Sequence, residues 1–123
     1  MKELQFSERG ALDGDRLQRL YTELGDREAD RALCDATEAV ALSLARISRA
    51  RRRGDLTDVS AQAVELAQSA RFVGLPTLQR VALDVATCAA AGATPALDAT
   101  LARLIRLGDN ALSTLWDPRD IGC

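Results

Sequence analysis

Residues 63–76 read AVELAQSARFVGLP, and this stretch decides the fold that the sequence predicts. Its apolar residues recur at intervals of three and four, as one face of a helix requires. They are Ala63, Leu66, Ala70 and Val73. Gly74 then suits the end of this helix, and Pro76 suits the first turn of the next, where the N–H that proline lacks has no partner in any case. Two consecutive helices joined by a tight turn are therefore expected.

The rest of the chain divides into helical segments by the same signals. Apolar residues follow helical spacing, while glycine, proline and aspartate stand at the segment ends, where caps and the helix dipole favour them. No alternating pattern of the kind that strands show competes with this spacing. The expected helices are residues 12–25, 26–53, 55–74, 76–91 and 95–116.

The connections between the last four segments are only a few residues long. Short connections bring consecutive helices alongside each other in opposite directions. The sequence therefore predicts an all-α fold, an up-down-up-down antiparallel four-helix bundle with an additional short N-terminal helix. At 123 residues the chain is long enough for one such domain, which we expect to span residues 1–123.

The charge balance argues against nucleic-acid binding. The chain carries 16 basic and 18 acidic residues, a formal net charge of −2, whereas proteins that bind nucleic acid usually carry a positive excess. No apolar stretch of about 18 residues could span a membrane, and the first residues lack the apolar centre of a signal peptide. The widely spaced Cys34, Cys88 and Cys123 are typical of reduced thiols, so we expect a cytoplasmic protein.

The complete absence of histidine excludes several kinds of site. Zinc sites with imidazole ligands, serine triads and di-iron bundles with Glu-x-x-His pairs all need it. No glycine-rich phosphate loop is present, and neither Cys34 nor Cys88 has a basic partner in the sequence that would activate a thiolate. We therefore expect no enzyme activity, no cofactor and no metal. The scattered carboxylates are interpreted as solvated; they include Asp26, Glu28, Asp30, Asp35 and Glu38.

Four positions of the opening stretch match a known signature. Ala63, Leu66, Ala70 and Gly74 fit the pattern Ala-His-x-Leu-Lys-Gly-x-Ser/Ala-x-x-x-Gly. In this the chain resembles the histidine-containing phosphotransfer (HPt) domains, four-helix bundles that pass a phosphoryl group between a sensor kinase and the aspartate of a response-regulator receiver domain. Upstream, LDGDRLQRLYTELGD resembles the short first helix of that family and ARRRGDLTDV resembles its hairpin, so the resemblance covers about residues 11–115.

The chain departs from the family at the residues that carry the chemistry. Val64 stands at the position of the phosphoacceptor histidine, Ala67 at that of the lysine and Gln68 at that of the glycine. A branched alkane has no lone pair to accept a phosphoryl group, and the chain offers no other histidine. The resemblance therefore implies a degenerate HPt domain that cannot relay phosphate through histidine.

Helix geometry predicts which residues of this segment face outward. With its apolar stripe turned inward, five others turn outward at spacings of three, four and seven. They are Ala61, Val64, Gln68, Arg71 and Phe72. We expect these five to contact a partner, either a receiver domain or a sensor kinase, with Val64 and Phe72 forming an exposed apolar strip. The alternative for Phe72 is that it folds under the first helix as part of the core.

Three functions stay open at this point. The first is a non-catalytic, HPt-like signalling module that binds a receiver domain or a kinase without accepting phosphate. The second is a structural bundle that self-associates as a homodimer through apolar surface on the long second helix and on the first. The third is phosphorelay through an unorthodox acceptor such as Glu65, which would lack the neighbouring lysine.

A run of arginines closes the expected second helix. It consists of Arg46, Arg49, Arg51, Arg52 and Arg53. These residues would either hold an acidic partner or a phosphate, or form a solvated helix end balanced by Asp55 and Asp58. The negative net charge and the scarcity of aromatic residues favour the second interpretation.

Overall fold

The computed structural model describes residues 14–115, except for the side chains of residues 114 and 115. Within this range every element of secondary structure is a helix, which confirms the predicted all-α class. Its helices are α1 (Gly14–Leu24), α2 (Asp26–Arg53), α3 (Leu56–Phe72), α4 (Pro76–Ala91) and α5 (Thr94–Asn110), followed by a π-helical turn at Ala111–Leu115.

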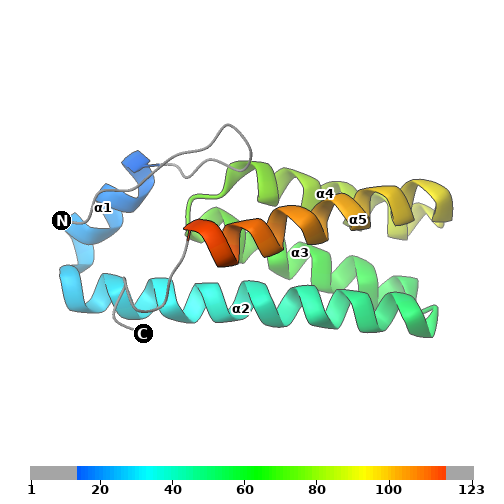
Figure 1. Ribbon diagram of the computed structural model, residues 1–123, viewed down its shortest axis with the longest axis horizontal. Helices are drawn as coiled ribbons and strands as arrows, with labels where there is room; N and C mark the ends of the chain where they lie inside the picture. The colour runs from blue at the N-terminus through cyan, green and yellow to red at the C-terminus, as the bar shows by residue number, and fades with distance from the viewer. Residues whose placement is uncertain (1–13, 116–123) are drawn as a thin grey trace.

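The four longer helices lie side by side along the long axis of the molecule (Figure 1). Helix α3 packs against α2 and α4, and α5 packs against α4 and more lightly against α2. Helix α1 packs against α2 at one end of the molecule, where the two helices are joined at Gly25 (Figure 1). The arrangement is that of a helical bundle.

The observed helix bounds differ from the predicted ones mainly at the ends. Helices α2 and α4 have the predicted bounds. Helix α3 starts at residue 56 because Asp55 is its N-cap, with a carboxylate that accepts a hydrogen bond from the N–H of Asp58 at 3.0 Å. The predicted last helix divides into α5 and the π-helical turn, while residues 12, 13 and 116 lie outside the described range.

Gly74 shapes the turn between α3 and α4. The sequence predicted that the helix ends near this glycine, and its φ of +75° is a left-handed conformation that suits glycine. The N–H of Leu75 donates to the carbonyl of Ala70 at 2.9 Å and that of Gly74 to the carbonyl of Arg71 at 3.2 Å, which is the Schellman pattern of a helix end. Leu75 is buried directly after the turn, so the turn also directs the chain back onto the core.

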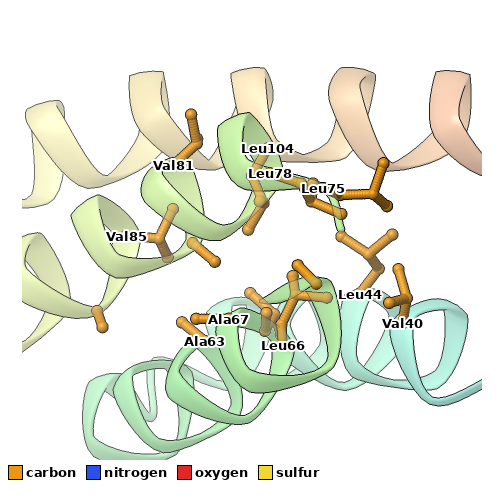
Figure 2. Close-up of a cluster of buried hydrophobic side chains, with 14 of the residues drawn as sticks. Val40, Leu44, Ala63, Leu66, Ala67, Leu75, Leu78, Val81, Val85 and Leu104 are labelled. Atoms are coloured by element: carbon orange, nitrogen blue, oxygen red, sulfur yellow. The ribbon is translucent and has the colours of Figure 1, made fainter. Parts of the chain in front are cut away.

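The core lies between the four long helices. In Figure 2 Leu66 of α3 lies in the same cluster as Leu78 of α4, Leu104 of α5 and Leu44 of α2. These side chains are almost completely buried, and each contributes about 2 kcal/mol through the apolar area removed from water. Buried alanines are frequent on α3 and α4, which pack extensively against each other, and such small side chains let two backbones approach closely. The buried alanines are Ala63, Ala67, Ala70, Ala82, Ala86 and Ala89.

Candidate functional site

The face of α3 that points away from the core carries the predicted contact residues. All five are exposed: Ala61, Val64, Gln68, Arg71 and Phe72. The two large apolar members keep much of their surface in contact with solvent, 40% for Val64 and 37% for Phe72. The prediction that these positions face outward is confirmed.

The residues of the family pattern that serve packing have the opposite environment. Ala63, Leu66 and Ala70 are completely buried, and Gly74 is buried as well. The buried stripe and the exposed stripe thus lie on opposite sides of α3, as expected for a helix with 3.6 residues per turn. The stripe itself follows from helix geometry and is shared by many bundles.

Val64 lies on the side of α3 that borders α4. Ser60 marks that side, because its hydroxyl donates to the carbonyl of Ala86 at 3.1 Å. At about 100° per residue, Val64 lies roughly 40° further round the helix than Ser60, toward solvent. Val64 therefore stands at the outer edge of the contact between α3 and α4.

We infer from the register of α3 with α4 that Leu83 lies near Val64. Ser60, near the start of α3, meets Ala86, near the end of α4, so α4 runs back along α3 from the turn at Gly74. That register places Val64 opposite residues 82–84. Of these, Leu83 has an exposed side chain, with 43% of its surface accessible. It lies about 60° around α4 from Ala86, the residue that Ser60 contacts, so helix geometry places it near Val64. We call these two residues the Val64–Leu83 patch.

Sequence reasoning missed Leu83 because it considered one helix at a time. The apolar spacing of α4 offered a signal, since Leu83 falls outside the stripe formed by Leu78, Ala82 and Val85. Its neighbour across the helix contact could be found only by pairing α3 with α4 in register. An isolated exposed leucine is common on protein surfaces and carries little information by itself.

Two arginines stand at the Gly74 end of the same face. Arg71 belongs to the last turn of α3 and Arg80 to the second turn of α4, where the register places it opposite Gln68. Both are exposed, and neither forms an ion pair within residues 14–115. The face thus combines an apolar centre with a positively charged end.

Phe72 lies beside α1. The Nε of Arg16 donates to the carbonyl of Phe72 at 3.3 Å, and the Phe72 side chain lines a depression of about 200 Å³ together with Leu20, Arg19 and Glu23. On α3, Phe72 is displaced from Val64 by about 12 Å along the axis and about 80° around it. The structure therefore brings Phe72 next to α1, where it stays exposed at the edge and does not join the core.

The three positions that carry chemistry in HPt domains differ in their environment. Val64 and Gln68 are exposed, whereas Ala67 keeps only 3% of its surface accessible, in the close contact with α4. A lysine at position 67 would have to leave that contact to reach the space beside Val64. Glu65 is exposed and accepts no hydrogen bond within the described part of the chain, and the only lysine in the sequence is Lys2. The face around Val64 is therefore aliphatic, and Glu65 forms no ion pair within residues 14–115.

Part of the arginine run is held by aspartates. Arg51 forms two hydrogen bonds with Asp98 of α5, Nε to Oδ1 at 2.8 Å and Nη2 to Oδ2 at 3.1 Å, and Arg53 pairs with Asp58 at 2.9 Å. The hydrogen bond from Arg51 lowers the pKa of Asp98, and the same bond raises the pKa of Arg51. Arg46, Arg49 and Arg52 are exposed. The pairing with Asp58 agrees with the interpretation of this run as a solvated helix end.

Another polar contact fixes α1 to α2. The hydroxyl of Tyr21 donates to Oδ1 of Asp30 at 2.6 Å. Burial and this hydrogen bond to a carboxylate raise the pKa of Tyr21 well above its ordinary value. The contact joins α1 to α2. Residues 14–115 contain no group of three or more histidine, cysteine, aspartate or glutamate side chains placed to hold a metal ion.

The expectation that the cysteines are reduced thiols is wrong for Cys34. Cys34 is disulfide-bonded, while Cys88 is a free and half-buried thiol. The spacing of the cysteines in the sequence gave no sign of a disulfide at Cys34. Since disulfides persist mainly in oxidising compartments, the cysteines lend no support to a cytoplasmic location. None of the helices between residues 14 and 115 is both long enough and apolar enough to cross a membrane.

Comparisons of the chain with protein-family models, with curated proteins and with solved structures found no match.

Proposed function

We propose that this protein is a non-catalytic, HPt-like signalling module that binds a response-regulator receiver domain, or a sensor kinase, without accepting phosphate. The observation that carries the proposal is the exposed Val64 in the middle of α3, at the position where the resemblance places the phosphoacceptor. Its side chain keeps 40% of its surface accessible, and the register of α3 with α4 places the exposed Leu83 near it. Apolar contacts around such a position supply affinity without a phosphoryl group.

The proposed contact surface has a graded composition. The Val64–Leu83 patch forms its centre, Ala61 leaves room for close approach at one end, and Gln68 and Arg71 supply polar contacts at the other. Phe72 lies at the margin, beside α1. An apolar centre with a polar rim is the usual composition of a transient protein interface.

The proposal includes an up-down-up-down antiparallel order of α2 to α5. Three contacts support this order. Ser60 at the start of α3 meets Ala86 at the end of α4, and Arg51 at the end of α2 meets Asp98 at the start of α5. Further along, Leu44 of α2 approaches Gly108 of α5, as two helices of opposite direction require. A cytoplasmic location also belongs to the proposal, because receiver domains and the catalytic parts of their kinases act there.

Binding to receiver domains tests the proposal directly. Purified receiver domains of the source organism would be titrated one by one with the protein in a calorimeter. We expect at least one to bind, and the Val64→Asp/Leu83→Asp variant to bind it at least about tenfold more weakly, since two charged groups would be buried at the interface. Leu42→Asp is the matched control, because Leu42 is also an exposed leucine, lies on α2, and its replacement should leave this binding unchanged.

Phosphate transfer provides the second test. A sensor kinase that carries labelled phosphate should leave the protein unlabelled, because Val64 offers no acceptor. Acid-labile label on the protein would contradict a non-catalytic role and would direct attention to Glu65. If no receiver domain or kinase binds, the proposed signalling function is wrong.

A further inference from the structure

The outer face of α2 carries a stripe of exposed residues with coiled-coil spacing. Its members follow one another at alternating intervals of three and four, and all six are exposed. They are Asp35, Glu38, Leu42, Ala45, Arg49 and Arg52. A stripe of this spacing stays on one side of a helix over several turns, which is what a second helix needs for side-by-side packing. We call these residues the α2 stripe.

The α2 stripe changes from acidic through apolar to basic residues along its length. Its N-terminal members, Asp35 and Glu38, are acidic, and its C-terminal members, Arg49 and Arg52, are basic. The centre is apolar, and Leu42 has 50% of its surface exposed, the largest fraction among the exposed large apolar residues of the described range. A helix face of this composition is complementary to a copy of itself in the opposite direction.

The charges of the α2 stripe have no partners within the described part of the chain. Arg51 and Arg53, which lie between and beside the stripe positions, are held by Asp98 and Asp58. Arg49 and Arg52 form no such ion pair within residues 14–115, and the same is true of the stripe's two carboxylates. The stripe is therefore available to an external partner.

We propose that two copies of this protein associate through their α2 stripes in an antiparallel, two-fold symmetric dimer. With the axis between Leu42 and Ala45, Leu42 of one copy packs on Ala45 of the other. The same register places Glu38 opposite Arg49 and Asp35 opposite Arg52. Each contact occurs twice by symmetry. Each side of the two-fold axis therefore has one apolar contact and two contacts between opposite charges.

Charge decides the orientation of the pair. A parallel arrangement would place Asp35 against Asp35 and Arg52 against Arg52, which is repulsive along the whole stripe. In the antiparallel arrangement all four stripe charges of each copy meet an opposite charge. The 18 residues from Asp35 to Arg52 extend over about 26 Å, so the contact covers most of α2.

The dimer contact and the proposed receiver contact use separate surfaces. The α2 stripe faces away from the buried side of α2, which packs against α3 and α5, and α2 forms one edge of the bundle (Figure 1). The Val64–Leu83 patch lies on α3 and α4. The dimer therefore stands independently of the proposed signalling function, and both surfaces can be occupied at once.

The strength of the contact follows from its composition. The apolar centre is small, because it consists of two leucines and two alanines, and exposed ion pairs contribute little each. We expect a weak dimer that forms at high protein concentration and dissociates as ionic strength rises, because salt screens the exposed charge pairs.

Charge-reversed variants test the dimer and its register. Sedimentation equilibrium at low ionic strength should show a dimer for the unaltered protein. The dissociation constant of the dimer should be at least about tenfold higher for both E38R and R49E, since each substitution replaces two attractive pairs with repulsive ones. An equimolar mixture of the two variants should form a heterodimer, because the arginine introduced in one chain then meets the glutamate introduced in the other. R103E is the control, because Arg103 is an exposed residue of α5 and the substitution changes the charge by the same amount. This variant should remain dimeric.

The outcomes are distinct. A protein that stays monomeric at low ionic strength, variants that dimerise like the unaltered protein, or a mixture that stays monomeric would each overturn the inference. Circular dichroism confirms that the variants are folded, as expected for exposed positions. A dimer together with no binding of any receiver domain would keep this inference and support the structural alternative over the signalling function.

Discussion

Gly108 of α5 packs directly against the side chain of Leu44 of α2. Both residues are buried. A Cβ atom added to Gly108 would collide with Cδ1 of Leu44 and would lie 3.2 Å from its Cδ2. The absence of a side chain at residue 108 therefore allows α5 to lie close to α2 at this position.

Gly108→Ala should be destabilising in the presence of Leu44 and stabilising in its absence. Alanine gains about 1 kcal/mol of helix propensity over glycine, but overpacking against Leu44 costs about 1–3 kcal/mol. In a Leu44→Ala background only the gain remains. Urea denaturation of both single variants and the double variant should give a coupling energy of about 1–3 kcal/mol. Equal effects of Gly108→Ala in the two backgrounds would contradict this packing. Leu44→Val offers a second background that is itself less destabilising than Leu44→Ala.

Tyr21→Phe should loosen α1. The variant keeps the ring but removes the hydroxyl that donates to Asp30 at 2.6 Å, and a hydrogen bond to a charged acceptor contributes about 1.5–3 kcal/mol. Hydrogen exchange of the α1 amides should accelerate accordingly, with little change in α3 and α4. Thr22→Val is the control, because the Thr22 hydroxyl donates to the carbonyl of Gln18 within its own helix. Unchanged exchange in α1 would show that apolar packing alone holds this helix.

Alkaline pH should remove the contribution of Tyr21. Its folded pKa is raised above the ordinary value of 10.0, mainly by burial and then by the bond to Asp30. The unfolded chain therefore loses the tyrosine proton first, and stability falls as pH rises past about 10. The difference in unfolding free energy between the unaltered protein and Tyr21→Phe should be constant near neutral pH and shrink above that value. A difference that grows at high pH would contradict the raised pKa.

The sequence predicted the features of the fold that depend on local chemistry. The end of α3 near Gly74, the start of α4 at Pro76 and the exposure of Val64 follow from glycine, proline and helix period alone. Features that depend on how helices pair could not be predicted in this way. Leu83 joins Val64 only through the register of α3 with α4, and Ala67 is buried because α4 covers that side of α3.

The ion pair of Arg51 with Asp98 should make a pH-dependent contribution to stability. Its hydrogen bonds lower the folded pKa of Asp98 below the ordinary 3.8. The contribution is therefore complete above that ordinary value and is lost as pH falls through the folded pKa. Urea midpoints should be slightly lower for Asp98→Asn at neutral pH and converge with those of the unaltered protein in acid. Because the pair is exposed, added salt should reduce the difference, and a salt-independent difference would point to another cause.

Aspartate substitutions along α3 should separate its exposed stripe from its buried one. Val64→Asp should change the free energy of unfolding by less than about 0.5 kcal/mol, because Val64 is exposed and the two residues have similar helix propensities. Ala67→Asp, three residues further on, should cost about 3–5 kcal/mol or unfold the protein, since a carboxylate would enter the contact with α4 without a partner. Urea denaturation followed by circular dichroism measures both. Comparable losses for the two variants would mean that Val64 is packed inside the bundle, and a surface for partner binding could not then be centred on it.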